Sequence, residues 1–178
     1  MSLFPEEPLD SPLGYFPGQL NQTLHNGRWS IVRKLGWGPR SSTWLAIDTQ
    51  EADRIEAIKI FTVAATKDGT AEKERDLFQK ILKGIQANLP QFEGDFEEDS
   101  SKGKHMCLIF ENLSTSVELL RLGNSDSGYL LLHIVKKIIA DVLEILCELS
   151  DFWVFHGGEH PSVWTNASLT NLHFLVQH

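Results

Sequence analysis

The segment from residue 29 to residue 47 constrains the fold more than any other part of the chain. Its sequence is WSIVRKLGWGPRSSTWLAI, in which two runs rich in β-branched and aromatic residues flank a turn that contains Gly36, Gly38 and Pro39. β-Branched and aromatic side chains favour strands, whereas glycine and proline favour the turn between them. The pattern therefore predicts a β-hairpin with a glycine-rich tip.

Further strands and one helix are expected after this hairpin. Residues 54–62 alternate well enough for a third strand, and residues 70–83 are rich in Glu, Lys and Leu and predict a helix. A weaker strand is expected around residues 91–94 and a stronger one at 105–111. The polar run 97–104 between them is interpreted as a solvated hairpin loop.

The last large element is a long helix over residues 129–149. Lys137, Asp141, Glu144 and Glu148 recur at steps of four, three and four residues, which places them in one polar stripe. Most other side chains of this helix are apolar, so roughly two-thirds of its circumference is expected to be buried. Charged residues interrupt every apolar run before it reaches the ~18 residues of a membrane span, so no membrane contact is expected.

Charge and composition exclude some classes of partner. The chain has 178 residues and a formal net charge of −8, and its 16 Lys and Arg residues are scattered. Nucleic-acid binding requires clustered cations that neutralise phosphates, so we expect no nucleic-acid partner. The first dozen residues, rich in proline and acids, predict an extended or disordered arm, with structure beginning near Tyr15. They contain no secretion signal, so we expect reduced thiols at Cys107 and Cys147 and a cytoplasmic location, with the nucleus as an alternative.

The hairpin and the residues after it resemble one known family. The stretch 26–38, which contains Leu-Gly-Trp-Gly, and the segment 41–46 (SSTWLA) are similar to the opening of SR-protein kinases. Downstream, a strand with Ala-Ile-Lys-Ile carries Lys59, and the next predicted helix carries Glu74. Glycine loop, strand lysine and helix glutamate follow one another in the order that protein kinases show. The resemblance covers roughly residues 14–150.

This resemblance implies a fold and a domain organisation. The fold class would be α+β: a kinase-like small lobe with a five-stranded antiparallel sheet and one αC-type helix, followed by a truncated, mainly helical remnant of the large lobe. The expected divisions are a flexible arm (1–13), the small lobe (14–113) and the remnant (114–178), which contains the long helix.

The resemblance also implies a nucleotide site. Backbone amides of the glycine loop would cover the phosphates, and the ammonium of Lys59, oriented by Glu74, would neutralise their charge. The segment 105–113 resembles the fifth strand and hinge of the family, which would make Phe110 the gatekeeper. The implied cofactor-binding residues are Gly36, Gly38, Ala57, Lys59, Glu74, Phe110, Glu111 and Leu113.

The resemblance fails where the catalytic loop of the family should follow. Family members carry His-x-Asp-x-Lys-Pro there, whereas residues 156–161 of this chain are HGGEHP. Gly158 then stands in the place of the catalytic aspartate and His160 in that of a phosphate-contacting lysine, and no Asp-Phe-Gly segment follows. Without the aspartate no group is identifiable that holds magnesium or accepts the proton of the substrate, which would slow transfer by several orders of magnitude.

The glycine loop also departs from the family pattern. Pro39 removes one backbone N–H, Arg40 replaces an aromatic residue at the tip, and Thr43 replaces a valine that packs on adenine. Arg40 has two interpretations, a solvated loop residue, which we favour, and a phosphate contact. We therefore expect either no cofactor or weak ATP binding without a recognisable magnesium site.

Together these features predict a pseudokinase that acts as a binding or regulatory module. Its partner would be another protein or a second copy, bound through the helix 129–149 and the C-terminal tail, because later helices cover that helix in a complete kinase. The alternative is a weak ATP-binding protein or an unconventional serine/threonine phosphotransferase that uses Lys59 and Glu74 with a base from the segment 156–160, namely His156, Glu159 or His160. The His and Glu residues of that segment lie in a Gly-Gly turn, so no metal site is expected.

Overall fold

The chain divides into two compact units. In the computed structural model, the described residues are 8, 10–51, 53–81, 90–112, 117, 121, 123 and 129–151. The first unit consists of residues 1–79 and 91–112, and the second of residues 80–90 and 113–178.

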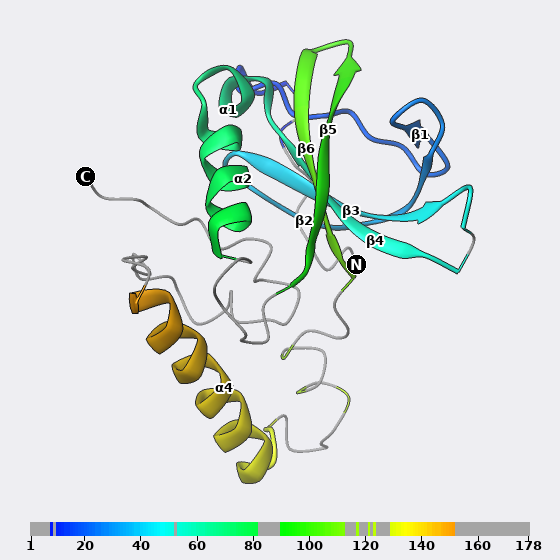
Figure 1. Cartoon of the computed structure of the whole chain (residues 1–178). Coiled ribbons are helices and arrows are strands. Elements are labelled where there is room, and N and C mark those ends of the chain that lie inside the picture. Colours follow the sequence, from blue (N-terminus) through cyan, green and yellow to red (C-terminus); the bar gives the residue numbers. More distant parts are fainter. Residues whose placement is uncertain are drawn as a thin grey trace. The chain divides into compact units, whose positions relative to one another are not determined.

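A six-stranded antiparallel sheet forms the body of the first unit, in the order β1-β2-β3-β4-β6-β5 (Figure 1). The sequence predicts the five long strands, β2 to β6. It does not predict β1, because two residues are too few for an alternating pattern. The strands are β1 (Thr23–Leu24), β2 (Trp29–Gly38), β3 (Ser41–Asp48), β4 (Ile55–Phe61), β5 (Phe92–Ser100) and β6 (Gly103–Glu111).

The hairpin of β5 and β6 corrects one prediction. Residues 97–100 continue β5 as a strand and only residues 101–102 form the turn, so the polar run 97–104 is not a loop. β5 is an edge strand in which alternate carboxylates are exposed to solvent while the backbone pairs with β6. Such a strand lacks a continuous apolar pattern, and its composition therefore resembles that of a loop.

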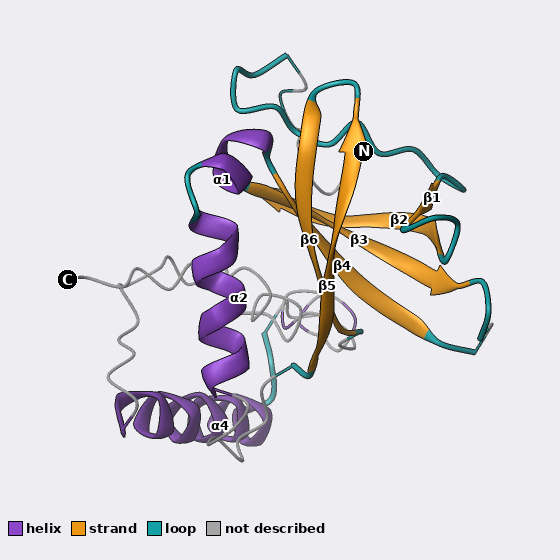
Figure 2. Cartoon of the chain, turned by 45° about the horizontal axis from the view of Figure 1, so that its top comes forward, coloured by secondary structure: helices purple, strands orange, loops and turns teal. Residues whose placement is uncertain are grey.

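Two helices lie along one side of this sheet (Figure 2). α2 (Thr70–Ile81) lies where the sequence predicts a helix. α1 (Val63–Lys67) is not predicted, because a five-residue helix has no periodic pattern to detect. The side chain of Thr62 caps α1 by accepting a hydrogen bond from the N–H of Ala65 at 3.2 Å.

The N-terminal segment contacts α1 before it reaches the sheet. The N–H of Ser11 donates to the carbonyl of Pro8 at 2.8 Å, and the carbonyl of Gly14 accepts from the N–H of Val63 at 2.9 Å. Gly14 has a φ of 68°, which favours glycine, and a side chain there would press on Val63 at 3.1 Å. Ordered contacts thus begin a few residues before Tyr15, earlier than predicted, while the domain boundary at residue 13 stays a prediction.

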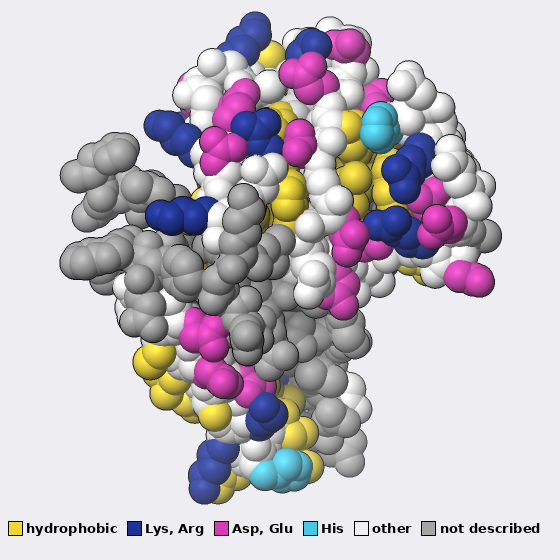
Figure 3. All heavy atoms as spheres, viewed as in Figure 1, with side chains coloured by type: hydrophobic (Ala, Val, Ile, Leu, Met, Phe, Trp, Pro, Cys, Tyr) yellow, Lys and Arg dark blue, Asp and Glu magenta, His cyan; other side chains and the backbone are white. Residues whose placement is uncertain are grey.

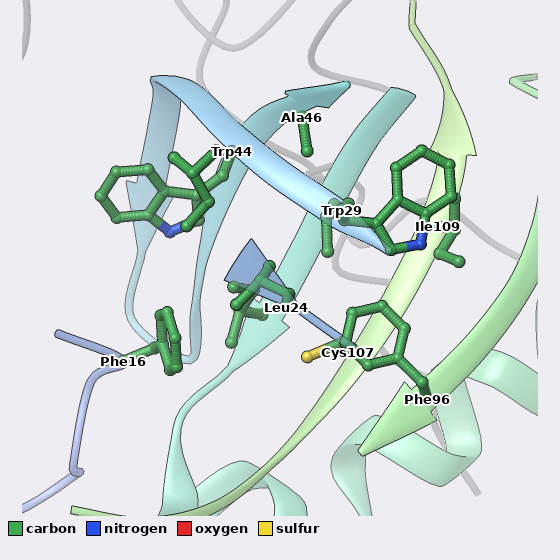
Figure 4. Close-up of a cluster of buried hydrophobic side chains, with 11 residues drawn as sticks. Phe16, Leu24, Trp29, Trp44, Ala46, Phe96, Cys107 and Ile109 are labelled. Carbon is green, nitrogen blue, oxygen red and sulfur yellow. The ribbon is translucent and has the colours of Figure 1, made fainter. Parts of the chain in front are cut away.

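The hydrophobic core lies on one face of the sheet (Figure 4). Side chains alternate between the two faces of a strand, so Trp44 and Ala46 of β3 point to the same face as each other. Gly18 is required by close approach, because a Cβ there would lie 2.7 Å from the ring of Trp44. The core residues are Phe16, Leu24, Trp29, Ile31, Trp44, Ala46, Ile58, Ile60, Phe96, Cys107 and Ile109.

The second unit contains the predicted long helix, α4 (Leu132–Asp151). Two of its apolar side chains, Ile145 and Leu149, are buried. Others are more than half exposed, namely Leu132, Ile139 and Leu143. Figure 3 shows apolar side chains at the surface of this helix, with charged side chains between them. Among the described residues, no helix is both long and apolar enough to span a membrane.

Candidate nucleotide site

The register of the sheet gathers the predicted phosphate contacts on the face opposite to the core. Gly36 of β2 pairs with Thr43 of β3, and Thr43 pairs in turn with Lys59 of β4. Residues directly opposite each other in antiparallel strands point to the same face. One cross-strand row therefore connects the glycine hairpin to the strand lysine.

A neighbouring row contains the predicted adenine contacts. Leu45 of β3 pairs with Ala57 of β4, and Ala57 pairs with Phe110 of β6. Ala57 and Phe110 are buried, whereas Glu111 is exposed at the end of β6. Leu113 lies outside the described residues. The sheet thus brings Ala57 and Phe110 together beside the lysine row, and their contact with a nucleotide stays a prediction.

The ion pair predicted between Lys59 and Glu74 is present. The Nζ atom of Lys59 lies 2.6 Å from Oε1 of Glu74, and the two side chains are 0% and 8% exposed. Burying an ammonium group is costly unless a carboxylate compensates its charge. The ammonium also lies 5.1 Å from the ring centroid of Phe61, within the range of a cation–π contact. The pair therefore joins α2 to β4 through compensated buried charges.

Three phenylalanine rings pack α2 onto the same face of the sheet. The ring centroid of Phe110 lies 4.8 Å from that of Phe78 on α2 and 5.7 Å from that of Phe92 on β5. Tilted and edge-to-face arrangements at these distances are favourable for aromatic pairs. Phe110, the predicted gatekeeper, therefore also holds the helix that carries Glu74.

Two buried hydroxyl groups on this face of β3 lack a hydrogen-bond partner among the described residues. They belong to Ser41 and Thr43. By contrast Ser42, whose side chain alternates to the other face, accepts a hydrogen bond from Nε1 of Trp44 at 3.0 Å. A buried hydroxyl without a partner costs free energy that an apolar side chain of similar shape avoids. The site face of β3 thus carries hydrogen-bonding groups that the fold does not use.

The tip of the glycine hairpin is tied to the start of α2. The carbonyl of Arg40 accepts from the N–H of Thr62 at 2.8 Å, and its guanidinium donates to the carboxylate of Asp68 and to the hydroxyl of Thr70. Hydrogen bonds from Thr70 and then from Arg40 lower the pKa of Asp68 to about 2. The favoured interpretation of Arg40 as a solvated residue misses this ion pair, because its partner lies 28 residues away in the sequence.

Tyr15 supports the same hairpin from the N-terminal segment. Its hydroxyl donates to the carbonyl of Gly38 at 2.9 Å, and its ring meets that of Trp37 edge to face at 5.8 Å. Tyr15 itself is buried. The hairpin is thus held at Gly38 by the N-terminal segment and at Arg40 by the start of α2.

Proteins with similar sequences are SR-protein kinases. The serine/threonine-protein kinase SRPK of Physarum polycephalum is 34% identical over 115 residues, which cover 62% of this chain and 27% of that protein. The serine/threonine-protein kinase spk-1 of Caenorhabditis briggsae is 32% identical, over 97% of this chain and 16% of that protein. SRSF protein kinase 3 of Homo sapiens is 32% identical, over 73% of this chain and 23% of that protein. No family model matches the chain.

The fold has a counterpart among solved structures. The crystal structure of a kinase domain matches with a TM-score of 0.64 at 23% sequence identity, over 80% of this chain and 40% of that chain. This chain is similar in sequence to SR-protein kinases and has a protein-kinase-like fold. The resemblance and the α+β kinase-like fold predicted from the sequence are thereby confirmed. The kinase-like chain spans 16% to 27% of the length of the curated relatives named above.

Gly36 is a glycine that the kinase-like chain does not need for its own folding. Its φ is not positive, and a Cβ added there would meet no protein atom within 4 Å. Neither backbone conformation nor packing among the described residues therefore requires glycine at this position. Close approach of a ligand to the hairpin backbone is a remaining physical reason for it.

The described part of the kinase-like chain offers no other reactive cluster. Burial raises the pKa of the Cys107 thiol well above its ordinary value, which disfavours the reactive thiolate. The thiol of Cys147 is exposed on α4. Among the described residues no group of three or more His, Cys, Asp and Glu side chains is placed to hold a metal ion. Gly158 and His160 lie outside the described residues.

Proposed function

We propose that this kinase-like chain is a pseudokinase, a catalytically inactive module that binds or regulates another protein. The observation that carries the proposal is Gly158 in the position of the catalytic aspartate, with His160 in the position of the lysine that follows it. Phosphoryl transfer depends on positioning and charge compensation, so the loss of these groups lowers the rate by several orders of magnitude. The Lys59–Glu74 pair supports an assembled small lobe without supplying the missing base.

A phosphotransfer assay tests the inactive state. The purified chain is incubated with radiolabelled ATP, Mg²⁺ and a serine-rich protein acceptor, beside a Lys59→Ala variant. We expect the wild-type chain to label the acceptor no more than the variant does. Labelled acceptor that disappears in Lys59→Ala would overturn the proposal and favour an unconventional phosphotransferase.

The binding role rests on the exposed side of α4. Leu132, Ile139 and Leu143 follow one another at steps of seven and four residues, which places them within about 40° of each other around the helix axis. A narrow apolar stripe of this kind fits against another helix. The partner in this proposal is a second copy of the chain, and capture of a different kinase-like protein is the alternative.

Sedimentation of α4 variants tests this pairing. We expect the wild-type chain to form a dimer and Ile139→Glu, in the middle of the apolar stripe, to dissociate it. Glu144→Gln, which lies outside the stripe, should leave the dimer intact. A wild-type chain that stays monomeric at high concentration, without binding a dye for exposed apolar surface, would contradict the binding role.

Weak ATP binding is the second candidate function, and Gly36 is the observation that favours it. Folding does not explain this glycine, whereas a phosphate chain that approaches the hairpin backbone would. Under this alternative ATP raises the melting temperature, and Gly36→Ala removes that shift without lowering the melting temperature of the free chain. Lys59→Ala should remove the shift as well. The absence of any shift with ATP, with or without Mg²⁺, would reject the alternative.

A further inference from the structure

Arg40 occupies the tip of the glycine hairpin and is held by acceptors on the loop before α2 and on its first turn. One guanidinium nitrogen, Nη1, lies 2.5 Å from Oδ2 of Asp68 and 3.0 Å from the hydroxyl oxygen of Thr70. Thr70 also donates to the other carboxylate oxygen of Asp68, from its N–H at 3.0 Å and from its hydroxyl at 2.6 Å. The three side chains form one closed network.

This network connects the hairpin tip to the buried ion pair. Thr70 is the first residue of α2, and Glu74 follows four residues later, on the same side of the helix. Glu74 in turn binds Lys59 at 2.6 Å. A single helical turn therefore lies between the acceptors of Arg40 and the carboxylate that binds Lys59.

We propose that Arg40 is a phosphate-binding residue of the glycine hairpin and that the carboxylate of Asp68 competes with a polyphosphate anion for it. This inference rests on the nucleotide-binding alternative given above and names the group that weakens that binding. A guanidinium binds carboxylates and phosphates through the same kind of donor. Asp68 occupies Nη1 of Arg40 and compensates its charge, so the carboxylate weakens the attraction of a phosphate to this side chain. The ligand class is a nucleoside triphosphate or another polyphosphate.

The exposure of the pair makes the exchange possible. The side chains of Arg40 and Asp68 are each 45% exposed, and ion pairs in such positions contribute little net stability. A triphosphate carries several negative charges against the single charge of the carboxylate, so it can compete on charge. The carbonyl of Arg40 stays bonded to the N–H of Thr62, which lets the side chain change partner while the backbone of the tip remains in place.

Calorimetric titration of the full chain without Mg²⁺ and at fixed ionic strength tests the competition. The variants are Asp68→Asn, Arg40→Gln and the double variant, and the probes are ATP, inorganic tripolyphosphate and adenosine. We expect Asp68→Asn to bind ATP and tripolyphosphate about fivefold tighter than the wild-type chain, the factor set by an exposed ion pair of ordinary strength. The double variant loses this gain, and adenosine binding does not change.

Asp76→Asn is the matched control. It removes one negative charge from an exposed position of α2, where Asp76 pairs with its neighbour Arg75 at 2.8 Å, and it changes the net charge of the chain by the same amount. We expect no gain in this variant. An equal gain in Asp76→Asn, a gain that survives Arg40→Gln, a gain for adenosine, or no gain in Asp68→Asn overturns the inference, as does a lack of binding by every variant.

The binding test of Arg40 and Asp68 does not depend on whether the chain is catalytically inactive. Labelled acceptor in the phosphotransfer assay would overturn the pseudokinase proposal, and the binding constants of the Asp68 and Arg40 variants would still decide the competition. Conversely, if the chain transfers no phosphate and all variants bind with equal affinity, the pseudokinase proposal stands and the proposed competition between Asp68 and polyphosphate is overturned.

Discussion

The two faces of the sheet are buried to a similar degree, but different interactions stabilise them. Ile58 and Lys59 are neighbours on β4, and both are fully buried. Ile58 belongs to the apolar core, where packing alone stabilises it. Lys59 points to the other face, where the carboxylate of Glu74 and the ring of Phe61 make its burial tolerable. Burial therefore does not distinguish these two neighbours, and the need for a compensating charge does.

The hydroxyl groups of β3 show the same difference. Ser42, on the core face, is hydrogen-bonded to Trp44, whereas Ser41 and Thr43, on the site face, find no partner among the described residues. The difference holds for the hydroxyl groups of β3, although the core also contains a buried donor without a partner among the described residues, Nε1 of Trp29. The site face thus retains polar groups at the expense of stability.

Among the variants that test this comparison, breaking the buried ion pair should change the free energy of unfolding most. Lys59→Met leaves the carboxylate of Glu74 buried without its partner, and we expect a loss of about 3–5 kcal/mol in the free energy of unfolding. Urea denaturation measures it. The double variant Lys59→Met/Glu74→Leu should recover most of the loss, because both charges are then absent. A double variant as unstable as the single one would mean that packing, and not charge, governs the site face.

Truncating the neighbouring core residue should cost slightly less and behave differently. Ile58→Ala removes buried methylene groups and leaves a cavity, so we expect a loss of about 3 kcal/mol. Combined with Glu74→Leu, its effect should be additive within about 0.5 kcal/mol, since the two side chains lie on opposite faces. Strong coupling in denaturation experiments would show that the faces are not independent.

Two hydroxyl substitutions on β3 should have opposite signs. Thr43→Val removes an unpartnered buried hydroxyl and should raise the free energy of unfolding by about 1 kcal/mol. Ser42→Ala removes the acceptor of the Trp44 indole N–H and should lower it by about 1 kcal/mol. Thermal and urea unfolding of the two variants measure both changes. A destabilised Thr43→Val chain would indicate a hydrogen bond that this hydroxyl makes in solution.

The smallest expected effect concerns pH and His105, a buried polar residue of β6. Its Nδ1 lies 2.7 Å from the carbonyl of Phe61 and its Nε2 lies 2.7 Å from the hydroxyl of Ser100, so the neutral ring donates to Phe61 and accepts from Ser100. Burial lowers its pKa below the ordinary value of 6.5, against the raising effects of that carbonyl, Asp99 and Glu98. The unfolded chain therefore binds a proton more readily than the folded one.

Stability contributed by neutral His105 is complete above about pH 6.5 and decreases as the pH falls through that value toward the lower pKa of the folded state. Urea midpoints measured between pH 7.5 and 5.5 should decrease, and His105→Gln should make the decrease shallower. An identical slope in the variant would assign the dependence to other groups.

Local sequence patterns were sufficient to predict several helices and strands. The hairpin with its glycine tip, the helix α2 and the helix α4 each have a periodicity or turn chemistry that lies within a short window of sequence. The pairing of Lys59 with Glu74 follows from the family order of motifs and is present in the structure. Elements without local signals were missed, namely β1, α1 and the second half of β5.

Sequence patterns were enough to predict most of the long strands, the helices α2 and α4, and the position of Lys59 on a strand. That Gly158 and His160 stand in the aspartate and lysine positions of the family's catalytic loop stays a prediction from the sequence. These predictions depend on residue types and short spacings, which can be read from the sequence without the fold. The shared row of Gly36 and Lys59 and the pairing of Arg40 with Asp68 could be seen only in the folded chain. Such contacts join residues far apart in the sequence, and the register of the sheet, set by packing of both faces, selects them.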